Sequence, residues 1–138
     1  DPEMSRGLGD VYKRQFLCFA LLIPLVFLGG CAPSASDAYH KITPQAGYEM
    51  MKKEPITLID VREPAEYQQG HIPGARLIPL GTIDETIKDK LPDKKKPLIV
   101  YCRSGVRSKK AAMKLVELGY ADVRDMGGIL DWPYEIEK

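Results

Sequence analysis

Cys102 stands where the sequence could place a reactive thiol. Residues 98–101 are apolar and rich in β-branched side chains, residues 103–108 form a short segment containing glycine, and a lysine- and alanine-rich segment follows. This order predicts a strand, a tight loop and a helix. Backbone N–H groups of such a loop and a helix N-terminus stabilise negative charge and favour the thiolate, the reactive form of cysteine. Cys102 is therefore the candidate nucleophile.

Two charged residues at the end of another apolar run each have two interpretations. Asp60 ends the strand-like residues 57–60. It either orients the loop or a basic residue near the site, or caps the turn that follows. Arg62 either contacts a substrate anion or pairs with Asp60 or a nearby carboxylate. His71 suits a turn-fixing hydrogen bond better than the role of a general base.

The segments around these residues alternate between strand and helix patterns. Short apolar runs predict five strands, at residues 39–42, 57–60, 75–78, 97–101 and 121–126. Helices are expected at residues 44–53, 63–69 and 82–91, and from the loop to residue 118. Repeated strand–helix units are typical of an α/β domain, with a mainly parallel five-stranded sheet flanked by helices on both faces. Ligands bind such sheets at the carboxyl ends of the strands, which is where Cys102 lies.

Size and charge indicate one small globular domain. The chain has 138 residues and a net charge of +1, which suits a single core. Charge so near neutrality gives no reason to expect a nucleic-acid partner. No spacing of ligating side chains indicates a metal or an organic cofactor, so none is expected. We expect a monomer.

The N-terminal part of the chain has the pattern of an export signal. Residues 16–28 are apolar and too short to span a bilayer, for which ~20 residues are needed. They follow two basic residues and end in Leu-Gly-Gly-Cys at residues 28–31. That ending resembles the bacterial lipobox, which implies cleavage before Cys31 and lipidation of its thiol. We expect residues 1–30 to be a lipoprotein signal peptide, and the exported protein to be lipid-anchored to the cell envelope, facing the periplasm or the outside.

The first residues have a second interpretation. Residues 10–15 back-translate to GAT GTG TAT AAG AGA CAG, which resembles a transposon mosaic end used in sequencing libraries. Residues 1–15 are thus either a genuine start or a sequencing-adapter artefact. Small and polar residues follow the lipobox, so residues 31–38 are expected to form a flexible tether. The folded domain is expected to span residues 39–138.

The number and positions of the cysteines support a chemical role for Cys102. Of the three cysteines, Cys18 lies in the expected signal and Cys31 would carry lipid, which leaves Cys102 alone in the domain. No disulfide can then form within the domain. A free thiol in an oxidising compartment is open to oxidation. Its presence there favours a chemical role over that of a buried, inert cysteine.

Four motifs in order carry a resemblance to a known family. They are residues 60–67 (Asp-Val-Arg-Glu-Pro-Ala-Glu-Tyr), 70–75 (Gly-His-Ile-Pro-Gly-Ala) and 102–108 (Cys-Arg-Ser-Gly-Val-Arg-Ser), and the pair Gly127-Gly128 before Trp132. Together they resemble a single-domain rhodanese over nearly all of residues 39–138, which implies the rhodanese fold. In being exported and single-domain, the chain is similar to the periplasmic phage-shock rhodaneses.

The resemblance implies an enzyme of the thiosulfate:cyanide sulfurtransferase class that works without a cofactor. Cys102 would take the sulfane sulfur of a small anion such as thiosulfate, hold it as a persulfide, and pass it to a thiophilic acceptor such as cyanide or a thiol. Loop N–H groups and Arg103 or Arg107 would stabilise the anionic donor and the persulfide. The substrate-binding loop would consist of Arg103, Ser104, Gly105, Val106 and Arg107.

The length of the loop separates this chemistry from that of cysteine-based phosphatases. Those enzymes need Cys-x5-Arg, whereas here Arg107 lies one residue too early and Ser108 occupies the required position. A smaller ring of N–H groups suits a single sulfur atom. One departure concerns the donor, because thiosulfate-preferring rhodaneses can carry a basic residue where this chain has Ser104. Thiosulfate as the physiological donor is therefore left open.

Two function classes follow from these observations. The first is a sulfurtransferase that acts on small sulfane donors. The second is an exported persulfide carrier or a rhodanese-like binding module that serves a partner protein, such as a protein sulfur acceptor. Binding modules of this kind often lack the cysteine, so the presence of Cys102 favours catalysis.

Overall fold

The computed structural model describes residues 34–138. The expected signal peptide at residues 1–30, the adapter-like residues 1–15 and the lipidation site Cys31 lie outside the described residues. No helix in the described part of the chain is both long and apolar enough to cross a membrane.

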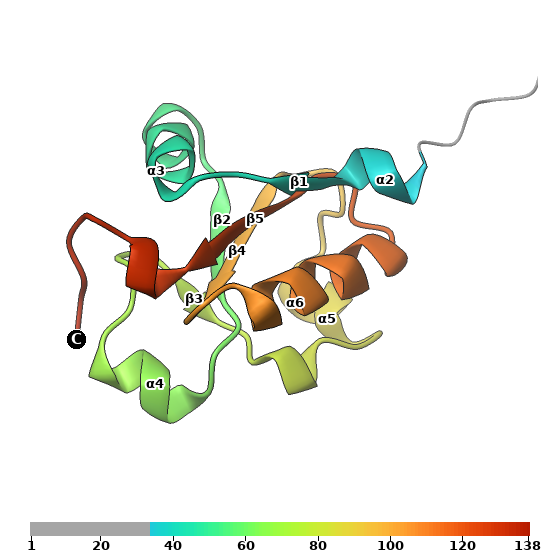
Figure 1. The fold of residues 1–138 in the computed structure, drawn as a ribbon. Helices are drawn as coiled ribbons and strands as arrows, with labels where there is room; N and C mark the ends of the chain where they lie inside the picture. Colours follow the sequence, from blue (N-terminus) through green and yellow to red (C-terminus); the bar gives the residue numbers. More distant parts are fainter. Residues whose placement is uncertain (1–33) are drawn as a thin grey trace, which may run out of the picture. The chain divides into compact units, whose positions relative to one another are not determined.

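Five parallel strands form one sheet at the centre of the domain (Figure 1). The strands are β1 (Tyr39–Lys41), β2 (Thr57–Asp60), β3 (Arg76–Leu77), β4 (Leu98–Cys102) and β5 (Val123–Gly128). Their order across the sheet is β1-β5-β4-β2-β3, so β4 is central, and every residue of β4 is buried. The predicted five-stranded, mainly parallel sheet is confirmed.

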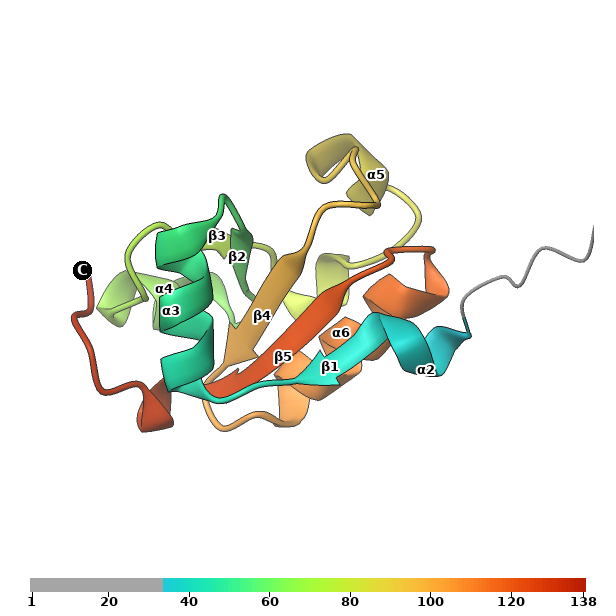
Figure 2. The same cartoon turned by 90° about the horizontal axis from the view of Figure 1, so that it is seen from above.

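Helices cover both faces of the sheet (Figures 1 and 2). They are α2 (Ala35–Ala38), α3 (Pro44–Lys53), α4 (Pro64–Gln69), α5 (Ile87–Lys90) and α6 (Val106–Glu117), with short 3-10 turns η2 (Leu80–Thr82) and η3 (Ile129–Asp131). One hydrophobic core joins the sheet to α2, α5 and α6. A second core joins the opposite face to α3. The α/β architecture expected from the sequence, with helices on both faces of the sheet, is present.

Side chains of β4 alternate between these two cores, because successive residues of a strand point to opposite faces. Leu98, Val100 and Cys102 belong to the core beneath α6. Ile99 and Tyr101 belong to the core beneath α3. The thiol of the last strand residue therefore lies on the α6 face, beside the N-terminus of that helix.

Two helices begin and end where the local sequence requires it. The Thr43 hydroxyl accepts a hydrogen bond from the Ala46 N–H at 3.1 Å and so caps α3. The helix α6 begins after Gly105, and the chain leaves it through Gly119, whose φ of 97° is in the left-handed region that glycine adopts readily. The start of α3 and the two ends of α6 agree with the expected helices.

The expected helix at residues 82–91 is wrong over most of its length. The structure instead has the 3-10 turn η2, a loop, and only four helical residues in α5. The cause is local, since the carboxylate of Asp84 accepts hydrogen bonds from both the N–H and the hydroxyl of Thr86. Such side-chain bonds compete with the helical pattern.

The tether also differs from the expectation at its C-terminal end. Residues 35–38 form α2 instead of a flexible segment, and Ala38 is buried in the core beneath α6. The small side chain of Ala38 allows this close packing. The folded unit therefore includes residues 35–38, ahead of the predicted boundary at residue 39.

Candidate active site

Cys102 ends the central strand and lies beneath the loop that follows it. Its exposed fraction is 0%. The backbone N–H of Gly105 points back to the thiol and donates a hydrogen bond to Cys102 Sγ at 2.9 Å. Gly105 can turn the chain in this way because its φ of 109° is in the left-handed region. The loop thus supplies an N–H group to the sulfur, and such a bond strengthens when the sulfur is anionic.

The end of β5 packs directly against this loop. A Cβ atom at Gly128 would overlap the backbone carbonyl of Arg103. The N–H of Leu130 donates a hydrogen bond to the same carbonyl at 3.3 Å. The glycine pair, which the sequence marked only as a motif, therefore allows two backbone segments to touch and holds the first residue of the loop in place.

A buried carboxylate holds the other end of the loop. Asp125 accepts hydrogen bonds from the Ser108 hydroxyl at 2.6 Å, the Gly127 N–H at 3.0 Å and the Tyr39 hydroxyl at 3.0 Å. Burial, and next the hydrogen bond to Asp125, raise the pKa of Tyr39 to about 12. The sequence reasoning missed Asp125, although an acidic residue within an expected buried strand was a usable signal.

The last residue of the loop forms an ion pair with α4. The Arg107 guanidinium binds the Glu66 carboxylate through two hydrogen bonds, at 2.7 and 2.9 Å. The hydrogen bonds from Arg107 make the largest contribution to lowering the pKa of Glu66 to about 2, and the hydrogen bond from the Glu63 N–H makes the second largest. The sequence left open whether Arg103 or Arg107 would stabilise an anion. The structure pairs Arg107 with Glu66, which the sequence reasoning missed, and leaves the Arg103 side chain exposed.

Asp60 and Arg62 form a buried pair, so the structural interpretation of both residues applies. Asp60 accepts bonds from the Arg62 guanidinium at 2.7 to 3.0 Å and from the Arg62 N–H at 2.9 Å, which caps the turn. The Tyr101 hydroxyl donates to Asp60 at 2.8 Å and accepts from the Ile72 N–H. Burial raises the pKa of Tyr101. This network fixes the turn after β2 beside the central strand.

A hollow of about 400 Å³ adjoins the loop, and we call it the active-site hollow. Its lining consists of Arg62, Glu66, Gln69, Gly70, Arg103, Ile129, Leu130 and Ile136. Arg103, which lines the hollow, directly follows Cys102 in the loop. Glu66, which also lines the hollow, forms an ion pair with Arg107 at the other end of the loop. A molecule in the active-site hollow would therefore lie against the segment that encloses the thiol.

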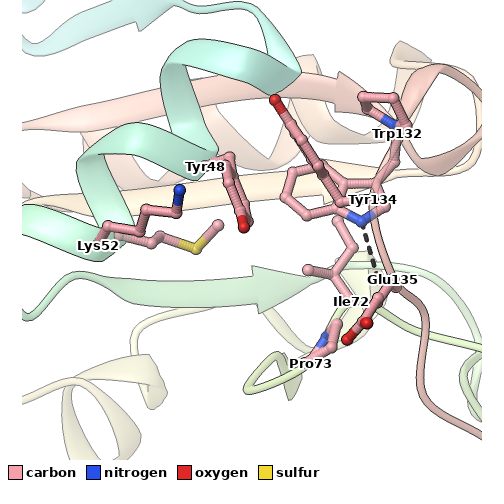
Figure 3. A pocket seen from close by; sticks show the side chains of 9 residues that line it. Tyr48, Lys52, Ile72, Pro73, Trp132, Tyr134 and Glu135 are labelled. Carbon is pink, nitrogen blue, oxygen red and sulfur yellow. Dashed lines mark hydrogen bonds between the residues drawn. The ribbon is translucent and has the colours of Figure 1, made fainter.

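A larger cavity of about 760 Å³ opens on the side of the domain covered by α3 (Figure 3). Tyr48 and Tyr134 stack there with ring centroids 3.9 Å apart, and Trp132 meets both rings edge-on. The Trp132 indole N–H donates to the carbonyl of Glu135 at 3.0 Å. Trp132 and Tyr134 thus close the core and line a cavity, but Cys102 belongs to the opposite core and does not line this cavity.

His71 has a structural place and does not contact the thiol in the described part of the chain. Its Nδ1 lies 3.0 Å from the Tyr67 carbonyl, and its ring stacks on Tyr67 at 3.8 Å. Its backbone pairs with Glu137 near the C-terminus. The turn-fixing interpretation of His71 is therefore the one that the geometry supports. Within residues 34–138, no cluster of three or more His, Cys, Asp or Glu side chains could hold a metal ion.

The arrangement can perform nucleophilic chemistry at sulfur. It combines a thiol at the carboxyl end of a central parallel strand, an N–H donor on that thiol, and an exposed guanidinium on the next residue. A thiolate held in this way attacks an electrophilic atom, and the N–H group stabilises the charge that Cys102 Sγ carries before attack.

Comparison with known proteins places these features in one family. The family described as "Rhodanese-like domain" matches residues 43–134. The chain is 45% identical over 73 residues to the thiosulfate sulfurtransferase PspE of Escherichia coli, an alignment that covers 53% of this chain and 70% of that protein. It is 36% identical over 96 residues to the thiosulfate sulfurtransferase GlpE of Pseudoalteromonas translucida, covering 69% of this chain and 90% of that protein.

A solved structure agrees with the sequence matches. It is described as a rhodanese with anions from E. coli, is 41% identical to this chain, and superimposes with a TM-score of 0.57. The superposition covers 60% of this chain and 98% of that one.

Proposed function

The chain belongs to the rhodanese-like domain family, and from that premise we propose that it is a sulfurtransferase in which Cys102 carries the transferred sulfur as a persulfide. The observation that carries the proposal is the Gly105 N–H on Cys102 Sγ, inside a loop that runs from Cys102 to Arg107. The curated relatives named thiosulfate sulfurtransferase support this class of reaction. A donor such as thiosulfate and an acceptor such as cyanide or a thiol fit it.

In the first half-reaction, the Cys102 thiolate attacks the outer sulfur of the donor. A bond forms between Cys102 Sγ and that sulfur, and the sulfur–sulfur bond of the donor breaks. With thiosulfate as donor, the electron pair leaves with sulfite. The new terminal sulfur carries the negative charge, which loop N–H groups and the Arg103 guanidinium stabilise. Because the thiol is fully buried, the loop must open slightly to admit the donor sulfur.

In the second half-reaction, the acceptor attacks the terminal sulfur of the persulfide. The sulfur–sulfur bond on Cys102 breaks, its electron pair returns to Sγ, and the thiolate is regenerated. Cyanide becomes thiocyanate, whereas a thiolate acceptor becomes a persulfide. The two half-reactions share one enzyme-bound intermediate, so the kinetics are expected to be ping-pong.

Thiocyanate formation from thiosulfate and cyanide tests the proposal, with wild-type protein and Cys102→Ala compared side by side. We expect turnover and a mass increase of one sulfur atom in the wild type, and neither in the variant. Equal activity of the two proteins would exclude Cys102 as the carrier. If the wild type took up sulfur but did not pass it to cyanide, the persulfide-carrier alternative would replace the enzyme.

The signal-like residues support a further part of the proposal, which concerns location. Residues 1–30 would be removed, and the lipidated Cys31 would hold the domain on the cell envelope, exposed to the periplasm or the outside. Radiolabelled palmitate should enter the wild type but not Cys31→Ser. Equal labelling of both proteins would exclude Cys31 as the anchor.

A further inference from the structure

We propose that the amino end of the sheet, where β1, β2, β4 and β5 begin, is a docking surface for anionic lipid headgroups. Cys102, at the carboxyl end of the sheet, would then face away from the bilayer. This inference rests on the proposed lipid anchor and adds the orientation of the anchored domain. Two independent features carry it, namely the point where the chain enters the domain and a hollow lined by basic side chains at the same end.

Four strands begin level with one another at the amino end of the sheet. Tyr39 of β1 pairs with Val123 of β5. Leu98 of β4 pairs both with Val123 and with Thr57 of β2. Cys102 is the last residue of β4, at the opposite end of the sheet. With a rise of about 3.3 Å per residue, Leu98 and Cys102 are about 13 Å apart along the strand.

The chain enters the domain at the amino end. The helix α2 ends at Ala38, directly before β1, and Ala38 is buried in the core beneath α6. Figure 2 shows α2 beside the start of β1. A chain extends by at most about 3.6 Å per residue, so the stretch from Cys31 to Ala35 spans at most about 14 Å. A lipid on Cys31 would therefore hold the amino end of the sheet close to the bilayer surface.

A hollow of about 170 Å³ at the same end is lined by three basic side chains, and we call it the amino-end hollow. Its lining includes Thr57 and Leu98, which are the first residues of β2 and β4, and the side chains of Arg76, Lys90, Lys96 and Asp93. In the part of the chain that the structure describes, none of the three basic residues forms an ion pair. The hollow therefore has an excess of positive charge.

Asp93 does not cancel this excess, because it is a single acid beside three basic residues, and its carboxylate accepts a hydrogen bond from the Lys95 N–H at 3.0 Å. A phosphodiester group in the amino-end hollow would accept charge-assisted hydrogen bonds from the guanidinium and ammonium groups. The strands β1 and β4 are two strand spacings apart, about 10 Å, so one flat bilayer surface could contact both α2 and the hollow.

Other basic residues extend this surface, but charge alone does not select it. Lys94 and Lys95 precede Lys96 and are exposed. Each basic residue near an anionic bilayer adds to the attraction, which salt screens beyond about 10 Å. Lys109 and Lys110, near the start of α6 and the carboxyl end of the sheet, are exposed as well. The entry of the chain through α2 is what decides between the two ends.

The test measures how fast a membrane-impermeant amine reagent labels individual lysines, with mass spectrometry as the readout. The protein, purified with its anchor, is added to vesicles of phosphatidylcholine alone or of phosphatidylcholine mixed with phosphatidylglycerol. On the mixed vesicles we expect labelling of Lys90, Lys95 and Lys96 to slow at least about fivefold, because these residues contact the anionic headgroups. Labelling of Lys109 and Lys110 should change less than about twofold. High salt should remove the difference.

Two double variants test whether the amino-end hollow is responsible. In Lys90→Gln/Lys96→Gln, labelling of Lys95 on the mixed vesicles should return to within about twofold of its rate on phosphatidylcholine. The matched control, Lys109→Gln/Lys110→Gln, removes the same number of exposed charges from the other end of the sheet and should leave Lys95 as protected as in the wild type. Thermal melting checks that both variants fold.

Each outcome supports or overturns the docking surface. Protection of Lys109 and Lys110 in place of the amino-end lysines, or equal protection on both kinds of vesicle, would overturn it. Protection of Lys90 and Lys96 by inorganic phosphate without vesicles would assign the hollow to a free anion and overturn it too. A protein without lipid on Cys31 that still showed the expected protection would refute the anchor and keep the surface, whereas loss of both would refute both. The thiocyanate assay tests sulfur transfer separately.

Discussion

Glu66 determines what the last arginine of the loop can do. Arg107 is held by both oxygens of Glu66, so its guanidinium acts as a brace between α4 and the start of α6, and the charge of Arg103 is the one that faces outward. From the sequence spacing alone, Arg103 and Arg107 were equally good candidates for stabilising an anion. Their partners distinguish them, and those partners come from distant parts of the chain.

Replacement of this acid should reduce stability in a pH-dependent manner. The pKa of Glu66 is lowered to about 2 in the folded protein, so the ion pair stabilises the fold above the unfolded value of 4.5 and loses this contribution as the pH falls towards 2. Because the pair is partly exposed, Glu66→Gln should cost about 1 kcal/mol at pH 7. Urea unfolding at pH 7 and pH 2.5 measures the difference between variant and wild type, which should shrink at the lower pH.

The control for this experiment is Glu85→Gln, which changes an exposed acid that forms no ion pair within residues 34–138. It should leave stability unchanged at both values of pH. A Glu66→Gln effect that was constant with pH would show that the ionised pair is not its source.

At the scale of elements, the site depends on the contact between β5 and the loop after β4. Gly128→Ala would push a methyl group into the Arg103 carbonyl and displace the loop from the thiol. Backbone cannot yield as easily as a flexible side chain, so sulfur transfer should fall at least about tenfold and stability by about 1–3 kcal/mol. The thiocyanate assay and urea unfolding together measure both effects.

Gly81→Ala provides the comparison, because nothing lies within 4 Å of the Cβ that it would add. We expect full activity and nearly unchanged stability for this variant. Equal losses in the two variants would mean that glycine flexibility, and not the contact with Arg103, explains the effect.

Elements with a strong local signal could be predicted from the sequence. The central strand β4 is a continuous apolar run, α3 has its Thr43 cap, and α6 has both a periodic apolar face and Gly119 at its end. The segment at residues 82–91 could not be predicted in this way. Its apolar residues fit a helix, but the hydrogen bonds of Asp84 with Thr86 replace the helical pattern.

The position of the candidate nucleophile and of the loop that follows it could also be predicted, because these residues are contiguous. The contacts that hold the loop could not, since they join residues that only the folded chain brings together. Glu66 and Arg107 are 41 positions apart, and Tyr39 and Asp125 are 86 apart. A single sequence carries no record of which acid meets which base across such distances.

At the scale of the whole molecule, the hydroxyl of Tyr39 connects an edge strand with the network beside the loop. Its bond to Asp125 joins β1 to β5, so Tyr39→Phe should reduce stability by about 1 kcal/mol at pH 8. The raised pKa, about 12 in the folded protein, means that this contribution is present below the unfolded value of 10 and disappears as the pH rises through 12.

Urea unfolding at pH 8 and pH 11.5 measures the expected change, and the gap between the two proteins should narrow at the higher pH. Tyr134→Phe is the control, because within residues 34–138 the hydroxyl of Tyr134 has no hydrogen-bond partner. A gap that stayed constant would exclude the tyrosine proton as its cause.

The two edge strands of the sheet are short, and their length affects the tendency of neighbouring molecules to aggregate. The outer strands β1 and β3 have three and two residues, and the exposed residues Lys41 and Arg76 lie on them. These strands therefore offer a neighbouring chain few free backbone hydrogen-bonding groups, and the positive charges of Lys41 and Arg76 lie beside them. Molecules packed at high density on a surface should therefore resist aggregation by edge-to-edge strand pairing. Sheets with longer, uncharged edge strands are more prone to such pairing.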